Sequence, residues 1–558
     1  MEERIWHRSY VSGIPREIPL EDITIPEILS RTAQKFPNRV ALIFLGKKIT
    51  YRELDLLANR FAHALGSLGL RPGDRIALLL PNVPQIVIAY FGAWRARLVP
   101  VPINPLYTDH EIEHQLTTSG ATALVSLDLL VPRMLALKEK TKVKTVITAH
   151  IKDYLPFPAK QLFPYVKKGM TVEYRPAPGY YNFLDLMKSG PDTPFGPPPA
   201  LDDLALIPYS GGTTGLAKGV AITHRNVSAI TQIAREWFFD IKESPESELA
   251  IFPFFHMAGF TAVMNLCVIN GWTAVLIPRP EPKAIMDMLL KYRSTIFLAV
   301  PTIYVGVLAL EEFKKADLTF IKGFFSGAAP LPIDTINALK EATGGADIVE
   351  GYGMTESTTF IAVTPWRGTL KPGSVGVPLP NVEVKIVDIE TGTKELPIGQ
   401  EGEIVFRGPN MCQGYYNMPE ETKNNIRNGW FHTGDIGKFD EDGYLYIVDR
   451  TKDMIIAGGY NIFPREIDEV LFGHPKVLEA CTIGVPHEYR GETVKSFIVA
   501  KPGESLAEAE LDAYCRTRLS PYKVPKIYEF VEVLPKSAVG KILKRELRDM
   551  ERARTPKE

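Results

Sequence analysis

The chain has 558 residues, four of them cysteines, and a formal net charge of −1. A chain of this length is too long for a single hydrophobic core, so we expect two or more domains. The near-neutral charge gives no indication of a nucleic-acid partner. The four cysteines are far apart and form no CxxC pair. This pattern argues against a disulfide scaffold or a zinc site and favours a reducing compartment.

Neither a secretory signal nor a membrane span is visible in the sequence. The first twenty residues are charged and contain prolines, without an apolar core. The longest apolar stretches, 262–277 and 297–310, are interrupted by Asn265, Asn270 and Pro301, and both are shorter than the roughly 18–20 residues of a span. We therefore expect a soluble, cytoplasmic protein, and peripheral attachment at the inner face of a membrane stays open.

The first half of the chain alternates helix and strand patterns. Thr24 with Glu27 and Thr50 with Glu53 have capping-box spacing, and the second box is followed by apolar residues at helical spacing. Residues 76–80 and 98–101 have the composition of buried strands and flank a predicted helix at 85–95. Apolar strands between helices predict a parallel sheet covered on both faces.

Residues 151–183 interrupt this alternation with prolines, lysines and aromatic residues. One interpretation is a surface excursion. The other is a contact with a membrane or a partner, because Leu162 and Phe163 lie among lysines. The sequence leaves both open.

The last third changes character. Residues 382–387, 402–407 and 443–448 have strand patterns, and a compact α+β stretch follows, with strands at 480–485 and 497–500 and a helix that we expect Ser505 and Glu508 to cap. We predict an N-terminal domain at 1–449 and a C-terminal domain at 450–558, with a hinge near 450–453.

Residues 209–219 (YSGGTTGLAKG) combine glycines, hydroxyls and a lysine. Glycines let a backbone approach phosphate closely and expose its N–H groups, so the segment predicts a phosphate loop rather than a plain flexible turn. It is not a Walker A loop, since the required second glycine and hydroxyl fall on Ala217 and Gly219. A dinucleotide fingerprint starting at Gly351 fails because Glu356 occupies its last glycine position.

Six further segments follow in order: 253–256 (PFFH), 326–330 (SGAAP), 351–356 (GYGMTE), 430–435 (WFHTGD), 449–453 (DRTKD) and 535–541 (PKSAVGK). With them the chain resembles, over nearly its whole length, the acyl-adenylate-forming superfamily of acyl-CoA synthetases, luciferases and peptide-synthetase adenylation domains. The resemblance implies an α/β fold. It has a large multi-sheet N-terminal domain of doubly wound layers with a β-rich subdomain, and a small mobile α+β C-terminal domain.

The resemblance also implies roles at the ATP site. Tyr352 would stack on adenine, Asp435 would bind the ribose with the aid of Arg450, and Glu356 would hold Mg²⁺ with Ser210 as a second ligand. The full set implied to bind ATP, Mg²⁺ or coenzyme A is Ser210, Gly211, Gly212, Thr213, Thr214, Gly215, Lys218, Gly327, Ala328, Ala329, Glu350, Gly351, Tyr352, Gly353, Met354, Thr355, Glu356, Asp435, Arg450, Lys452, Gly458, Gly459 and Lys541.

Lys541 is the expected catalytic lysine, with His256 and Thr214 beside it. A cation between the carboxylate and the α-phosphate would neutralise charge in the transition state, although composition alone would leave Lys541 as a solvated lysine in a basic tail. In the family the small domain rotates after adenylation. Lys452 would mark the hinge, and the loop with Gly458 and Gly459 would then line the thiol tunnel.

The sequence is most similar to bacterial long-chain fatty acyl-CoA synthetases, through segments 104–108, 154–158 and 484–492. Segment 253–260 contains no acidic residue, which disfavours an amino-acid substrate, and His256 either orients the carboxylate or is a core residue. We expect ATP-dependent conversion of a medium- or long-chain fatty acid to acyl-AMP and then acyl-CoA, in a monomer or homodimer. An aryl or alicyclic acid CoA ligase is the alternative, and a luciferase or a non-catalytic relative is less well supported.

Overall fold

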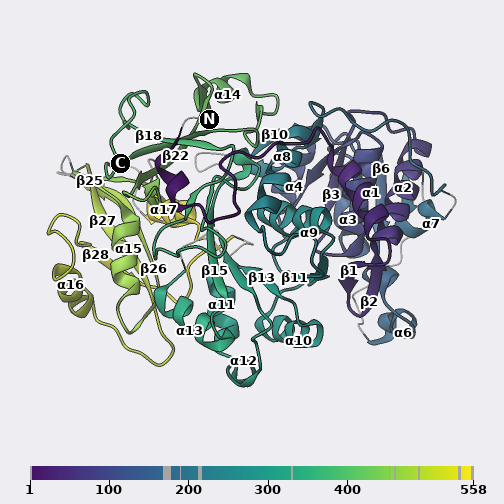
Figure 1. Cartoon of the computed structure of the whole chain (residues 1–558). Coiled ribbons are helices and arrows are strands. Elements are labelled where there is room, and N and C mark those ends of the chain that lie inside the picture. The colour runs from purple at the N-terminus through teal and green to yellow at the C-terminus, as the bar shows by residue number, and fades with distance from the viewer. Residues whose placement is uncertain are drawn as a thin grey trace. The chain divides into compact units, whose positions relative to one another are not determined.

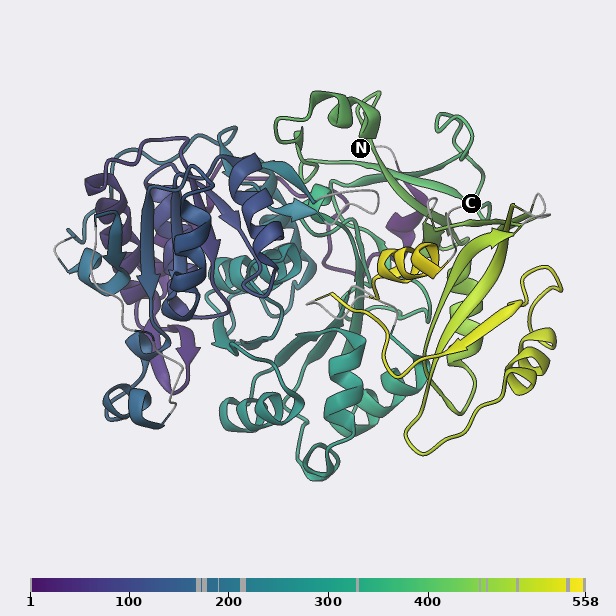
Figure 2. The same cartoon turned by 180° about the vertical axis from the view of Figure 1, so that it is seen from behind.

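The computed structural model describes residues 3–166, 172, 178–188, 190–210, 217–327, 331–450, 453–457, 460–487, 491–537 and 542–554. Contacts within the chain group it into two units (Figures 1 and 2). Unit 1 comprises Met1–Glu383 and Arg407–Gly429, and unit 2 comprises Val384–Phe406 and Trp430–Glu558. Unit 1 contains several sheets with helices, and the smaller unit 2 is α+β, which confirms the predicted fold class.

The largest sheet of unit 1 has nine strands. Its central pairs are parallel, and the pairs at both ends are antiparallel. The order is β17 (Val377–Pro378), β16 (Ala362–Val363), β15 (Asp347–Tyr352), β14 (Gly323–Ser326), β13 (Ile296–Ala299), β11 (Ser247–Ala250), β12 (Thr273–Leu276), β1 (Val40–Phe44) and β2 (Lys47–Thr50). Because neighbouring parallel strands end at one edge, this sheet brings the segments after β14 and β15 together.

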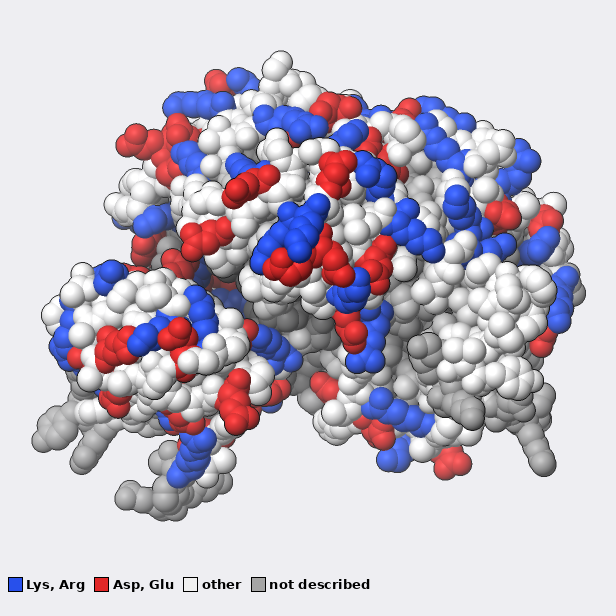
Figure 3. Space-filling model, turned by 90° about the horizontal axis from the view of Figure 1, so that it is seen from below, with Lys and Arg blue, Asp and Glu red and all other residues white. Residues whose placement is uncertain are grey.

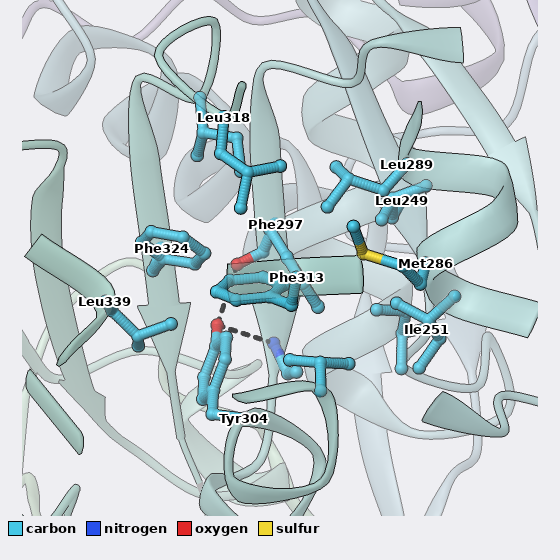
Figure 4. Close-up of a cluster of buried hydrophobic side chains, with 14 of the residues drawn as sticks. Leu249, Ile251, Met286, Leu289, Phe297, Tyr304, Phe313, Leu318, Phe324 and Leu339 are labelled. Carbon is cyan, nitrogen blue, oxygen red and sulfur yellow. Dashed lines mark hydrogen bonds between the residues drawn. The ribbon is translucent and has the colours of Figure 1, made fainter. Parts of the chain in front are cut away.

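One face of this sheet is closed by a hydrophobic cluster (Figure 4). Phe297, Phe324 and Leu249 of the strands pack with Met286 and Leu289 of α10 (Pro282–Tyr292). The buried hydroxyl of Tyr304, in α11 (Pro301–Leu308), donates to the carbonyl oxygens of Phe297 and Phe325 and accepts from the Ala299 N–H. The helix is thereby tied to the ends of β13 and β14.

A second sheet of unit 1 is wholly parallel, as predicted. Its order is β4 (Val99–Pro102), β3 (Arg75–Leu79), β5 (Ala123–Leu127), β6 (Thr145–Ala149) and β7 (Tyr180–Asn182). The strands predicted at 76–80 and 98–101 are each displaced by one residue. Every residue of α3 (Pro84–Arg95) is buried. The 151–183 segment supplies β7, so it is not only a surface excursion.

Both predicted capping boxes are confirmed. In α1 (Ile25–Lys35) the Thr24 N–H donates to Glu27 over 2.9 Å, and in α2 (Tyr51–Ser67) the Glu53 N–H donates to Thr50 over 3.2 Å. The other helices of unit 1 with at least five residues are η1 (Ile5–Ser9), α4 (Asp109–Ser119), α5 (Val131–Lys138), α6 (Ala159–Val166), α7 (Phe183–Met187), α8 (His224–Trp237), the π-helix η4 (Gly259–Asn265), α9 (Leu266–Asn270), α12 (Glu311–Lys315), α13 (Ile333–Thr343) and α14 (Pro419–Asn425).

A small antiparallel sheet completes the part of unit 1 that positions the site. Its central strand β10 (Lys218–Thr223) pairs with β8 (Leu204–Leu206), β9 (Tyr209–Ser210) and β20 (Gly414–Tyr415). This arrangement brings residues near position 415 beside the end of the glycine-rich loop.

Unit 2 contains two sheets. One has β18 (Glu383–Val387), β19 (Gly402–Arg407), β22 (Trp430–Phe439) and β23 (Leu445–Arg450). The other has β24 (Ile455–Ala457), β25 (Tyr460–Ile462), β26 (Val477–His487), β27 (Gly491–Ala500) and β28 (Ile527–Phe530), with helices α15 (Pro464–Phe472), α16 (Glu508–Arg516) and α17 (Lys544–Arg554). The predicted Ser505 cap is wrong. Helix α16 begins at Glu508, its N-cap is Ala507, and the Ser505 carbonyl instead accepts from Lys476.

Within the described part of the chain, no helix has the length and apolar character needed to cross a membrane.

Candidate functional site

Strands β9 and β10 hold the two ends of the glycine-rich loop. Ser210 lies opposite Lys218 and Tyr209 lies opposite Gly219 in this antiparallel pair. Residues 211–216 lie outside the described residues, and with them Gly211, Gly212, Thr213, Thr214 and Gly215. The structure therefore shows where the loop leaves and rejoins the sheet, with Ser210 at one end and Lys218 at the other.

The Lys218 side chain forms an ion pair with Glu421 of α14. Its Nζ also lies 5.5 Å from the ring centroid of Tyr415, which is a cation–π distance. The hydrogen bond from Lys218 lowers the pKa of Glu421, so the carboxylate is ionised at neutral pH. Lys218 is thus a cation held at the end of the loop by an anion and an aromatic ring.

Glu356 is buried in the short 3-10 helix η5 (Thr355–Ser357). The Tyr415 hydroxyl donates to Glu356 Oε1 over 2.9 Å, and the Cys412 N–H donates to the Glu356 carbonyl over 2.9 Å. Burial first, and then the Glu356 charge, raise the pKa of Tyr415, so the phenol stays protonated and can donate. Our sequence analysis missed Tyr415, because its contact with Glu356 depends on the pairing of β10 with β20.

These side chains belong to one constellation in unit 1, since both β9 and β10 contact η5. The constellation offers the Glu356 carboxylate, the hydroxyls of Ser210 and Tyr415, and the Lys218 cation. The described residues contain no group of three or more His, Cys, Asp or Glu side chains suited to a metal ion. Mg²⁺ beside nucleotide phosphates needs only one or two protein oxygens, so this donor set fits it.

The loop after Glu356 is strained and firmly anchored. Thr358 and Thr359 have φ values of 50° and 108°, which β-branched residues rarely adopt. Thr359 Oγ1 donates to the Met257 carbonyl over 2.8 Å. A Cβ added at Gly353 would lie 1.6 Å from the Thr359 carbonyl oxygen, so Gly353 is required by this loop's own packing. The loop positions Glu356 and fixes it to the segment that follows His256.

The ends of β14 and β15 lie side by side, with Ser326 opposite Glu350. Buried Glu350 accepts a 3.0 Å hydrogen bond from the Leu331 N–H, so it anchors the chain that returns after Gly327. Among the described residues other than its chain neighbours, none comes within 4 Å of a Cβ built on Gly327. Ala328 and Ala329 lie outside the described residues.

The rest of the GYGMTE segment continues β15. Gly351 and Tyr352 pair with Val363 and Ala362 of β16, and the Tyr352 carbonyl accepts from the Ile361 N–H over 2.8 Å. Met354 and Thr355 are half-buried and lead into η5. The described members of this segment therefore lie in succession along one edge of the large sheet.

His256 is half-buried just before the π-helix η4. The Ala258 N–H donates to His256 Nδ1 over 3.2 Å, so the neutral ring carries its proton on Nε2. A Cβ on Gly259 would lie 2.3 Å from the Pro253 carbonyl oxygen, so Gly259 serves backbone packing. Buried Phe260 packs against Tyr90 and Trp94, at centroid distances of 5.2 and 5.8 Å.

In unit 2, Asp435 of β22 lies opposite Arg450 at the end of β23. Arg450 Nε is 2.9 Å from Asp435 Oδ1, and the Asp435 carboxylate is buried. Glu403 of β19 supports the turn before Asp435: its carboxylate accepts from the Gly434 N–H over 3.1 Å and contacts His432 Nδ1 at 2.8 Å. Glu403 was not predicted, since only the pairing of β19 with β22 brings it near Asp435.

The expected catalytic lysine, Lys541, lies outside the described residues, as do Lys452, Gly458 and Gly459. The flanks of their loops are defined. Lys536 pairs with Ile542 as an isolated bridge, and Ala457 pairs with Tyr460. Each of these two loops is therefore closed at its base by antiparallel backbone pairing.

A buried ionic network connects the two flanks of the 451–452 segment with α17. Arg548 lies 2.5 Å from Asp453, and Lys544 lies 3.3 Å from Asp468 of α15. The Asp449 carboxylate accepts from the N–H groups of Arg450 and Arg465. Burial alone would lower the pKa of Lys544, but Asp468, Asp449 and Asp453 raise it, so the lysine stays charged. Burial raises the pKa of Asp468 to about 6.

Comparisons with known proteins show the family of the chain. Residues 29–416 match the family model of the AMP-binding enzyme, and residues 466–541 match that of the AMP-binding enzyme C-terminal domain. The chain is 42% identical over 553 residues to a long-chain-fatty-acid–CoA ligase of Bacillus subtilis, covering 98% of each chain. It also resembles the solved structure of an ATP-bound MatB from Rhodopseudomonas palustris, with 31% identity, a TM-score of 0.84 and coverage of 95% and 99%.

A second solved structure has a bound acyl-adenylate. It is an anthranilate CoA ligase, AuaEII, in complex with anthranoyl-AMP, with 28% identity, a TM-score of 0.85 and coverage of 96% of this chain and 98% of that one. The family models together span most of the chain, and the relatives and the solved structures match it over nearly its whole length. The chain therefore belongs to the AMP-binding enzyme family and is an AMP-forming acyl-CoA synthetase that uses ATP, a carboxylic acid and coenzyme A.

Proposed function

We propose that this enzyme activates a medium- or long-chain fatty acid in two steps, forming acyl-AMP with release of pyrophosphate and then acyl-CoA with release of AMP. The observation that carries the acid assignment is the 42% identity to the long-chain-fatty-acid–CoA ligase of Bacillus subtilis over 98% of both chains. Segment 253–260 has no acidic side chain to pair with a substrate amino group.

An aryl or alicyclic acid is the second candidate. It is favoured by the similarity to the anthranilate CoA ligase structure, whose adenylate carries a ring. The aromatic packing of Phe260 against Tyr90 and Trp94 is compatible with either acid, because it belongs to the core. One methylene changes binding by only about 1–3 kcal/mol, so specificity has to be measured across many acids.

The test is pyrophosphate release with acids from acetate to palmitate, plus benzoate and coumarate, with and without coenzyme A. The proposal predicts rates that rise toward long chains, with thioester formed only when coenzyme A is present. Release confined to ring acids would replace the fatty acid with the second candidate while leaving adenylation intact. Release with none of these acids would contradict the whole substrate assignment.

For the nucleotide, we assign Tyr352 to the adenine, with 327–329 opposite it, and Asp435 with Arg450 to the ribose hydroxyls. The buried Asp435 carboxylate is a hydrogen-bond acceptor beside the Arg450 guanidinium, which suits two hydroxyl donors. Ser210, Thr213, Thr214 and Lys218 take the phosphates. Lys218 would exchange Glu421 for a phosphate when ATP binds, since both anions compete for one ammonium group.

Glu356 is the proposed Mg²⁺ ligand, with Ser210 as the second. The hydrogen bond from Tyr415 orients the Glu356 carboxylate, and the strained loop at Thr358 and Thr359 fixes its backbone. When bound, Mg²⁺ would supply charge neutralisation on the phosphate oxygens. Tyr415 would then act by positioning, because it touches the carboxylate rather than the phosphates.

For the chemistry, we propose that Lys541 bridges the attacking carboxylate and the α-phosphate, and that Thr214 donates to the phosphates. His256 presents its Nε2 proton to the carboxylate, because Nδ1 is already an acceptor for Ala258. The reaction breaks the bond between the α- and β-phosphates and forms an acyl–O–P bond. The coenzyme A thiolate then displaces AMP from the acyl carbon.

We also propose that residues 450–558 move as a body about a hinge at 450–453 between the two steps, with Lys452 at the pivot. Lys541 would serve adenylation, and the loop with Gly458 and Gly459 would serve thiol transfer. The buried network of Lys544 and Arg548 supports this proposal, since it ties the helix after Lys541 to Asp453, which directly follows the pivot.

A further inference from the structure

Helix α6 (Ala159–Val166) is a surface helix without a single buried residue. It nevertheless presents large apolar side chains. Phe157 just before it is 83% exposed, and within it Tyr165, Val166 and Leu162 are 76%, 70% and 51% exposed. Apolar side chains exposed singly are normal on proteins, but four within ten residues form a contiguous patch that needs an explanation. We call these four residues the α6 patch.

The tip of the β1–β2 hairpin lies beside this patch. A Cβ built on Gly46 would lie 3.6 Å from the Pro156 ring, and Figures 1 and 2 both show α6 next to the hairpin. The hairpin tip adds Leu45, which is 41% exposed, and the exposed lysines Lys47 and Lys48. Two segments more than a hundred residues apart in the sequence therefore form one surface.

The charged side chains that these two segments are shown to expose are lysines. They are Lys47 and Lys48 of the hairpin and Lys160 of α6, and neither residues 44–50 nor residues 154–166 contain an aspartate or a glutamate. The chain as a whole has a net charge of −1, so this excess is local. Figure 3 shows a broad white surface whose rim carries basic side chains and a few acidic ones.

We propose that the α6 patch and the β1–β2 hairpin tip form the surface through which this enzyme docks on a lipid bilayer that contains anionic lipids. Aromatic and aliphatic side chains of an amphipathic segment enter the boundary between headgroups and acyl chains, and lysines beside them are attracted by anionic headgroups. A two-fold dimer through the same surface would bring like charges of the two copies together, which opposes self-association there.

This proposal does not depend on which acid the enzyme uses, because it rests on the surface alone. The sequence-based hypothesis named Leu162 and Phe163, of which only Leu162 belongs to the α6 patch. Phe163 is half-buried, whereas Phe157 and Tyr165 are the most exposed of the described aromatic residues in this segment.

The test is flotation of the full-length enzyme with vesicles of phosphatidylcholine alone or with about one-third phosphatidylglycerol. We expect binding to the anionic vesicles that weakens with added salt. Lys47→Gln with Lys48→Gln should lower the partition coefficient about 20- to 30-fold. Phe157→Ser with Tyr165→Ser should lower it about tenfold or more. Val533→Ser, at a side chain that is 73% exposed in unit 2, is the matched control and should bind like the wild type.

Pyrophosphate release without vesicles should be unchanged in all variants, which shows that they are folded. Equal partition onto both kinds of vesicle, or equal partition of wild type and patch variants, would overturn the proposal. Sedimentation velocity provides a second readout. A wild-type dimer that Phe157→Ser with Tyr165→Ser disperses would assign the patch to self-association and would also overturn it.

Discussion

The Tyr415 hydroxyl donates a 2.9 Å hydrogen bond to the carboxylate of Glu356, although 59 residues separate the two in the chain. Strand β20 carries the tyrosine to β10, and β10 contacts the 3-10 helix that contains the glutamate. A hydrogen bond to a charged group contributes about 1.5–3 kcal/mol, enough to hold one orientation of a carboxylate. Tyr415 is therefore a positioning residue for the proposed Mg²⁺ ligand.

Replacing Tyr415 with phenylalanine keeps the ring and removes only this donor. Since the Glu356 carboxylate would then lose a donor that orients it, the Mg²⁺ concentration for half-maximal pyrophosphate release should rise about tenfold or more. Tyr416→Phe is the control, because that ring packs against the core of the second sheet. An unchanged Mg²⁺ dependence in Tyr415→Phe would remove Tyr415 from the metal site.

Glu421 holds Lys218 at the end of the glycine-rich loop before ATP arrives. If Lys218 must leave this pair to bind phosphate, Glu421→Gln should lower the KM for ATP about two- to fivefold. This factor corresponds to the free energy that a partly exposed ion pair contributes. Lys218→Met should raise that KM. The measurement is initial-rate kinetics with ATP varied. A KM for ATP that rises in Glu421→Gln would mean that Glu421 instead holds Lys218 in its binding position.

Lys541 should matter for one half-reaction only. Lys541→Ala should slow acyl-AMP formation by a factor on the order of 10²–10³ or more, because charge on the transferring phosphoryl group loses its counter-ion. Thioester formation from supplied acyl-AMP should persist. Gly459→Leu should show the reverse pattern, since its added side chain would obstruct the thiol. Equal loss of both half-reactions in Lys541→Ala would contradict the proposed domain motion.

Lys544 neutralises a buried group of carboxylates, so its loss should make stability depend on pH. Lys544→Met should cost about 3 kcal/mol at pH 8, because Asp468 is left as a buried, unpaired charge. The pKa of Asp468 is already raised to about 6, above its value of about 3.9 in an unfolded chain. Protonation therefore favours the folded state, and the stability gained below pH 4 is lost as the pH rises through the folded pKa.

The pKa of Asp468 should rise further in Lys544→Met, so the loss of stability with rising pH should continue above pH 6. Thermal unfolding at pH 5 and pH 8 measures this loss of stability. The double variant Lys544→Met with Asp468→Asn should recover most of the stability at pH 8, because it removes both charges. A decrease in Tm that is the same at both pH values and is not rescued would show that Lys544 acts through packing.

Local patterns in the sequence predicted local structure well. The capping boxes at Thr24 and Thr50 form as expected because each is a contact between residues three apart. The Ser505 cap failed because the same short pattern also fits a loop whose carbonyl is taken by Lys476, from a distant part of the chain. The sequence patterns did not predict strand β7, which lies in a proline-rich stretch. This strand forms by pairing with β6, and no local pattern shows that contact.

For the candidate site, too, local patterns were informative and contacts between distant segments were not predicted. Motifs led us to propose Glu356, Asp435 and Lys218 as site residues, because the type of each residue and its neighbours carry the signal. The residues that support them, Tyr415 and Glu403, come from strands far away in sequence and have no motif of their own.

Isotope transfer tests the central claim, attack of a fatty acid carboxylate on the α-phosphate of ATP. The enzyme is incubated with palmitate labelled with ¹⁸O in both carboxylate oxygens, ATP, Mg²⁺ and coenzyme A, and the products are analysed by mass spectrometry. The acyl–O–P bond carries one carboxylate oxygen to phosphorus, and thiolysis leaves it on AMP. We predict AMP with one ¹⁸O, unlabelled pyrophosphate and palmitoyl-CoA that retains the other label. Label in inorganic phosphate with ADP as the nucleotide product, or AMP without label, would contradict the adenylate mechanism.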